Sequence, residues 1–104
     1  MKQIILACAL GVLFAAPVAA ETEAERVVRC EKQGEIIAKA AEARLARTRE
    51  AKANEAISET TEDAYKPSVP ILVGHIYTLP RADLKDVDVK TSFVEQCSGF
   101  DPSK

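Results

Sequence analysis

The chain has 104 residues, and its 14 basic and 16 acidic side chains give a formal net charge of -2 at pH 7. This length allows one small domain, and the acidic balance argues against a nucleic-acid-binding protein, which needs a basic surface. Because the chain has no Trp, two Tyr and three Phe, we expect a thin core made mainly of Ala, Val, Ile and Leu.

Residues 1–20 have the pattern of a secretory signal peptide, with a positive charge at Lys2, an apolar run over residues 4–16 and small residues up to Ala20. The apolar run of about 13 residues is shorter than the roughly 20 that span a bilayer as a helix. We therefore expect cleavage after Ala20 and a periplasmic or secreted protein with no stable membrane anchor. A lipoprotein signal that ends at Cys8 is the weaker alternative, because hydrophobic residues continue well past it.

The mature chain would keep two cysteines, Cys30 and Cys97. Free thiols are rare in an oxidising compartment, and two cysteines allow only one pairing. We therefore predict a Cys30–Cys97 disulfide, and closing a loop of about 67 residues is worth about 4 kcal/mol in the chain-entropy model. The sequence indicates no charged environment or helix start that would activate either thiol, so we interpret the bond as a structural staple and not as a redox centre.

Residues 22–60 contain no Pro, and Gly34 is their only Gly, so their Ala, Glu, Arg and Lys content predicts one long helix or two helices in line. Thr22 and Glu25 fit a capping box at its start. After Leu45 the apolar pattern fades, and we expect the helix to leave the body of the protein there. Before that point, small or apolar residues at steps of three and four share one face: Val27, Cys30, Gly34, Ile37, Ala41 and Leu45.

Residues 58–69 are polar and include a proline, which predicts a linker. Residues 69–79 form the most hydrophobic stretch of the mature chain, and their spacing fits a short helix that ends before Pro80. A C-terminal helix then carries Cys97 on its apolar stripe and ends at Gly99. The stripe consists of Leu84, Val87, Thr91, Val94 and Cys97.

We predict an all-α fold of about three helices, because both cysteines then lie on apolar helical stripes. An α+β fold with a hairpin from 69–79 and 87–94 is the alternative, since residues 87–94 also alternate between apolar and polar side chains. In either case we expect residues 21–104 to form a single small domain.

No catalytic, cofactor or metal site is predicted. His75 is the only histidine, so it has no second histidine with which to share a metal or a proton, and we interpret it as structural. The sequence has no nucleophile elbow, phosphate loop, zinc motif or haem-attachment motif. We therefore expect a protein that is not an enzyme.

Two glycines and three large side chains are candidate contact residues. Gly34 and Gly74 each lie in or beside an apolar stripe, where they would let two helices approach closely, although either one would also fit a helix break. Tyr77 falls off the main stripe of its segment, and with Ile71 and Tyr65 it is a candidate interaction surface. Core packing of the aromatic rings is the alternative.

Several short motifs resemble those of small secreted bacterial proteins of uncharacterised function. They are the Ala-rich tract of residues 37–44, Ile76-Tyr77-x-x-Pro80 and the terminal Phe93-x-x-x-Cys97. The chain is also similar in size, helicity and cysteine number to the periplasmic acid-stress chaperones. The resemblance implies a periplasmic helical domain with one disulfide and no enzymatic activity.

We predict a non-enzymatic exported protein that acts through protein–protein interaction and has no nucleic-acid partner. An acid- or stress-responsive periplasmic chaperone is one alternative, because protonation of the 16 carboxylates would leave the chain strongly positive. An immunity or inhibitor protein against a toxin or hydrolase is the other, in keeping with a small exported chain.

Overall fold

The computed structural model describes residues 21–99, and every element in this range is a helix. Because residues 21–99 contain no strand, the all-α class is confirmed and the hairpin alternative from 69–79 and 87–94 is wrong. The predicted signal peptide, with Cys8, lies outside the described residues. The elements are α2 (Glu23–Leu45), α3 (Glu50–Glu59), the 3-10 helix η2 (Asp63–Ser68), α4 (Val69–Tyr77), α5 (Arg81–Asp86) and α6 (Val89–Ser98).

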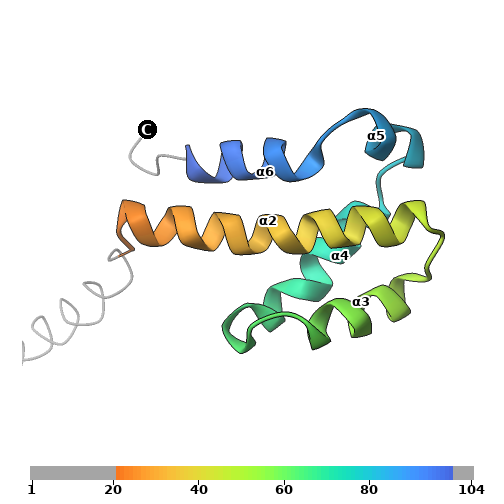
Figure 1. Ribbon diagram of the computed structural model, residues 1–104, viewed down its shortest axis with the longest axis horizontal. Helices are drawn as coiled ribbons and strands as arrows, with labels where there is room; N and C mark the ends of the chain where they lie inside the picture. Colours follow the sequence, from red (N-terminus) through yellow and green to blue (C-terminus); the bar gives the residue numbers. More distant parts are fainter. Residues whose placement is uncertain (1–20, 100–104) are drawn as a thin grey trace, which may run out of the picture.

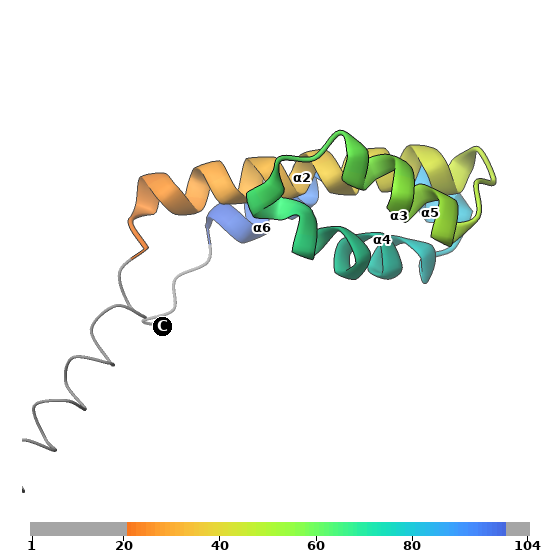
Figure 2. The same cartoon turned by 90° about the horizontal axis from the view of Figure 1, so that it is seen from below.

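The long helix α2 is the centre of the fold, and all the other elements contact it. Figure 1 shows α6 along one side of α2 and α3 along the other, while Figure 2 shows α4 beneath α2 and next to α3. The chain therefore builds a small bundle in which α2 is covered on several sides. The first turn of α2 is closed by the predicted capping box, in which the Thr22 hydroxyl accepts from the Glu25 N–H and the Glu25 carboxylate accepts from the Thr22 N–H.

A tight turn ends α2 and reverses the chain. Arg47 has a left-handed φ of 63°, the Thr48 N–H donates to the Ala43 carbonyl at 2.9 Å, and the Arg47 N–H donates to the Arg44 carbonyl at 3.1 Å. This is the hydrogen-bond pattern of a Schellman motif, with arginine where glycine is usual. The expectation that the helix continues in line and leaves the body is therefore wrong.

The helix α3 folds back because it has its own apolar side chains to bury. Ala53 and Ile57 are 1% and 5% exposed, and they join the core that α2 and α4 form. The segment 58–69, predicted as a linker, contains the end of α3 and all of η2. The polar character of this segment places it at the surface, but it does not prevent helical turns.

The core lies between α2, α3, α4 and α5. The hydrophobic run that the sequence singles out forms α4, and its apolar residues are buried on one broad face, while Ile71 on the opposite face is 73% exposed. In contrast, α6 contains no fully buried residue. The core residues are Ile36, Ile37, Ala40, Ala41, Ala53, Ile57, Val69, Val73, Ile76 and Leu84.

The C-terminal segment is two helices instead of the expected one. Leu84 is buried within α5, the backbone is extended at Val87, and Asp88 then caps a new helix, α6. The Asp88 carboxylate accepts from the Thr91 N–H at 3.0 Å and from the Thr91 hydroxyl at 2.8 Å, and these hydrogen bonds lower its pKa. Because Asp88 restarts the helix, Val87 is 48% exposed and does not share the buried stripe.

Candidate functional site

The disulfide joins the N-terminal half of α2 to the last turns of α6, so the two helices run antiparallel. The Cys30 and Cys97 sulfurs are 2.00 Å apart, and their Cα atoms are separated by 5.7 Å. The predicted bond is therefore confirmed. The two sulfurs differ in environment, because Cys30 is 0% exposed and Cys97 is only partly buried.

A positive charge lies beside the accessible end of this bond. The Arg29 Nη1 group donates to the Cys97 Sγ atom at 3.8 Å and to the Gln33 side-chain oxygen at 3.4 Å. The other guanidinium nitrogens, Nε and Nη2, hold the Glu21 carboxylate at 2.8 and 3.1 Å, and this hydrogen bonding raises the pKa of Arg29 and lowers that of Glu21. The interpretation that neither thiol has an activating charge nearby is therefore wrong at Cys97.

Gly34 lies on the face of α2 that packs against α6. A Cβ atom built on Gly34 would be 2.6 Å from Cγ2 of Val94, which is closer than a methyl group can sit, and 3.4 Å from Cγ of Lys90. Gly74 differs, because a Cβ atom there would meet only the Glu50 carboxylate, at an ordinary 3.6 Å. Of the two candidate packing glycines, only Gly34 lies at a close helix–helix approach.

A pair of alanine substitutions tests this difference. We expect Gly34→Ala to lower the free energy of unfolding, because forced overpacking costs about 1–3 kcal/mol and the gain in helix propensity offsets only about 1 kcal/mol of it. Gly74→Ala, the matched control, should raise the stability by up to about 1 kcal/mol. Urea denaturation of both variants measures the difference. Adding Val94→Ala should recover much of the loss at Gly34, and equal stabilisation by both glycine substitutions would contradict the close approach.

The three residues of the predicted interaction surface do not form one patch. Tyr77 lies at the C-terminal end of α4, where its hydroxyl donates to the Thr48 carbonyl at 2.6 Å and its ring lies 5.5 Å from the Arg44 guanidinium. Burial of the ring raises the pKa of Tyr77. Tyr65 precedes the other end of α4, on η2, and Ile71 is exposed between them. The two rings therefore lie near opposite ends of α4. The Tyr77 hydroxyl is also hydrogen-bonded to the turn between α2 and α3.

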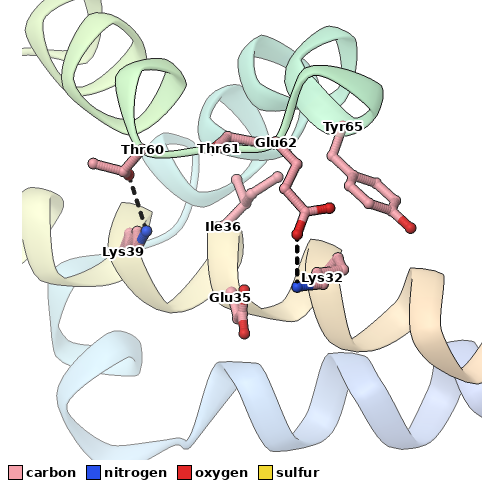
Figure 3. A pocket seen from close by; sticks show the side chains of 8 residues that line it. All are labelled: Lys32, Glu35, Ile36, Lys39, Thr60, Thr61, Glu62 and Tyr65. Atoms are coloured by element: carbon pink, nitrogen blue, oxygen red, sulfur yellow. Dashed lines mark hydrogen bonds and ion pairs between the residues drawn. The ribbon is translucent and has the colours of Figure 1, made fainter.

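A hollow of about 160 Å³ lies between α2 and the segment that joins α3 to η2 (Figure 3). The Lys32 Nζ atom pairs with the Glu62 carboxylate at 3.0 Å, which raises the pKa of Lys32, and the Lys39 Nζ atom donates to the Thr60 hydroxyl, also at 3.0 Å. The hydroxyls of Thr60 and Thr61 donate to the Ile57 carbonyl. Both lysines therefore fasten the connecting segment to α2, and we interpret this hollow as a structural junction.

An exposed apolar surface lies at the start of α2. Val27 and Val28 are 42% and 53% exposed, and Val28 lines a shallow hollow of about 410 Å³ together with Ala24 and Tyr65. We call Ala24, Val28 and Tyr65 the N-terminal apolar surface. Charged side chains of Glu21, Glu25 and Arg29 border the same hollow. The sequence places Val27 on the buried stripe, but it lies one turn before Cys30, where α6 is near its end.

A second apolar hollow, of about 180 Å³, separates α4 from α6, and His75 lies at its edge with Ile37, Ile76 and Phe93. His75 is exposed on the surface of α4. Within residues 21–99, no group of three or more His, Cys, Asp or Glu side chains is placed to hold a metal ion.

None of the helices between residues 21 and 99 is long and apolar enough to cross a membrane. The resemblance to small periplasmic proteins rests on the sequence motifs alone. Comparison of the chain with protein-family models, with curated proteins and with solved structures finds no match.

Proposed function

We propose that the protein is an exported, non-enzymatic binding protein whose N-terminal apolar surface contacts a partner protein. The observation that carries the proposal is the exposure of Val28, at 53%, beside Ala24 and Tyr65 at one hollow. Single exposed apolar side chains are common in proteins, but a cluster around a shared hollow indicates an interaction site. Here Val28, Ala24 and Tyr65 line the same hollow.

The charges around this surface also fit a protein interface. Glu21, Glu25 and Arg29 border the hollow, so an apolar centre is surrounded by charged side chains. Protein interfaces commonly have this arrangement of a dehydrated apolar core and a polar rim. The Arg29–Glu21 ion pair holds two of these charged groups in fixed positions at the edge of the surface.

Export is the second part of the proposal. Its support is the signal-peptide pattern of residues 1–20 and the Cys30–Cys97 bond, since disulfides persist mainly in oxidising compartments. Cleavage after Ala20 would leave Glu21, at the border of the N-terminal apolar surface, as the first residue.

Site-directed crosslinking in the producing cells tests the interaction. We expect Val28→Lys to reduce crosslinking to the partner at least about tenfold, because a lysine at an interface centre removes apolar contact and adds a charge that must be desolvated. Ile71→Lys is the matched control, since Ile71 is a still more exposed apolar residue, at 73%, on α4 and does not line the hollow. The intact mass of the purified protein reports cleavage after Ala20 in the same experiment.

Two results would overturn the proposal. One is a partner whose crosslinking survives Val28→Lys as well as it survives Ile71→Lys. The other is the absence of any crosslinked partner when the unsubstituted protein is folded and exported. If the captured partner is a hydrolase or a toxin, the same surface would serve an inhibitor, and if unfolded proteins are captured mainly at acid pH, it would serve a chaperone.

A further inference from the structure

We propose that Cys97 is a thiol–disulfide exchange site, at which a protein dithiol reversibly opens the Cys30–Cys97 bond. The proposal does not rest on partner binding, and Arg29 borders both sites. It starts from the unequal exposure of the two cysteines. Cys30 is 0% exposed, whereas Cys97 lines an open hollow of about 350 Å³ with Arg29, Phe93 and Gln96. A thiolate that approaches from solvent therefore reaches Cys97 and not Cys30.

The charge beside Cys97 favours exchange at this sulfur. Arg29 Nη1 lies 3.8 Å from the Cys97 Sγ atom, while Nε and Nη2 are bound to Glu21. The guanidinium therefore directs its Nη1 group toward the sulfur, and the Glu21 carboxylate holds it in that orientation through Nε and Nη2. A cationic group in this position attracts an incoming thiolate and stabilises a departing one.

The exchange proceeds in two steps. In the first, one thiolate of the dithiol attacks Cys97 Sγ and forms a mixed disulfide, while the Cys30–Cys97 bond breaks and its electron pair leaves on the Cys30 sulfur, which takes up a proton. In the second, the other thiol of the dithiol loses its proton and attacks the sulfur bound to Cys97. Cys97 then leaves as a thiolate beside Arg29, so the dithiol is oxidised to a disulfide and the Cys30–Cys97 pair is reduced by two electrons.

Reduction of the disulfide would mainly affect α6. No residue of α6 is fully buried, and the core residues all belong to α2, α3, α4 and α5. The disulfide is the covalent link that holds the end of α6 against α2. Reduction would therefore leave α6 held to the rest of the bundle by noncovalent contacts alone, among them those of the partly buried Val89 and Phe93.

The site of attack is tested with glutathione, a monothiol that stops at the mixed disulfide. The oxidised protein, carrying Cys8→Ala so that only two cysteines remain, is treated briefly, quenched with acid and mapped by peptide mass spectrometry. We expect glutathione on Cys97 in at least about tenfold excess over Cys30, because only Cys97 is accessible. Glutathione found mainly on Cys30 would overturn the proposal.

The role of Arg29 is tested by the rate of reduction with dithiothreitol at neutral pH. We expect Arg29→Gln to slow reduction about three- to tenfold, the range for two charges about 4 Å apart when water screens them. Arg29→Lys keeps a positive charge without the forked contact to Glu21 and should restore most of the rate. Arg49→Gln, which removes the same charge at the start of α3, beyond the far end of α2, should leave the rate unchanged. Equal rates for Arg29→Gln and the unsubstituted protein, or failure of Arg29→Lys to restore the rate, would contradict the assignment.

Discussion

Loss of the Cys30–Cys97 bond is expected to lower the free energy of unfolding by about 4 kcal/mol, the loop-closure value for a bond that spans 67 residues. The net stability of a domain of this size is of the same order, at roughly 0.05–0.15 kcal/mol per residue. A domain whose core contains no Trp or Phe among its buried residues has little stability in reserve. Guanidinium denaturation of the Cys30→Ala/Cys97→Ala variant, in a Cys8→Ala background, measures the loss.

The loss should also be unevenly distributed over the structure. Because α6 has no fully buried residue, its amides should lose most of their protection from hydrogen exchange, while the amides of α4 should keep a larger share. Dithiothreitol should lower the denaturation midpoint of the disulfide-bonded protein and leave that of the double variant unchanged. Equal midpoints with and without the bond would show that α6 is held by noncovalent contacts alone.

Local signals in the sequence account for the main elements of the fold. The capping box at Thr22 and Glu25, the long run free of proline and the apolar stretch before Pro80 are local patterns, and each of them marks α2 or α4 correctly. The α2–α3 turn has no such signal. Arg47 takes the left-handed conformation that usually selects glycine, at a cost of about 1–2 kcal/mol. Burial of Ala53 and Ile57 after the turn offsets this cost, and burial is a property of the assembled bundle.

The prediction of α2 also shows why a single stripe is an incomplete description. The helix is buried against α4 as well as α6, so Ile36 and Ala40, which lie beside the predicted stripe, are 2% and 0% exposed. Val27 belongs to the stripe and is exposed. The pairing of helices decides which positions of the stripe are covered, and this information comes from contacts between distant segments.

The candidate site is less predictable than the fold for the same reason. The contact between Arg29 and Cys97 joins residues 68 positions apart, and it depends on the direction of one guanidinium group. In the sequence alone, Arg29 is one of many charged residues expected on the surface of a helix. The disulfide, in contrast, follows from the count of cysteines and the predicted compartment, without any knowledge of the fold.

The second large effect is expected at Ile76, which is 2% exposed and is among the largest fully buried side chains of the described chain. Ile76→Ala should lower the free energy of unfolding by about 2–5 kcal/mol, because it removes buried apolar groups and leaves a cavity that the surrounding helices only partly fill. Val69 and Val73 precede it on the buried face of α4, and all three contribute to the core that α2 encloses. Thermal and urea denaturation of the disulfide-bonded protein measure the change.

Ile71 provides the matched control, since it is the same residue type on the same helix and is 73% exposed. Ile71→Ala should change the stability by less than about 0.5 kcal/mol, as is usual for surface substitutions. The contrast tests the orientation of α4 directly, because a rotation of this helix about its axis would bury Ile71 and expose Ile76. Comparable losses from the two substitutions would therefore show that α4 buries a different face from the one seen here, and the core built on Val69, Val73 and Ile76 would have to be reassigned.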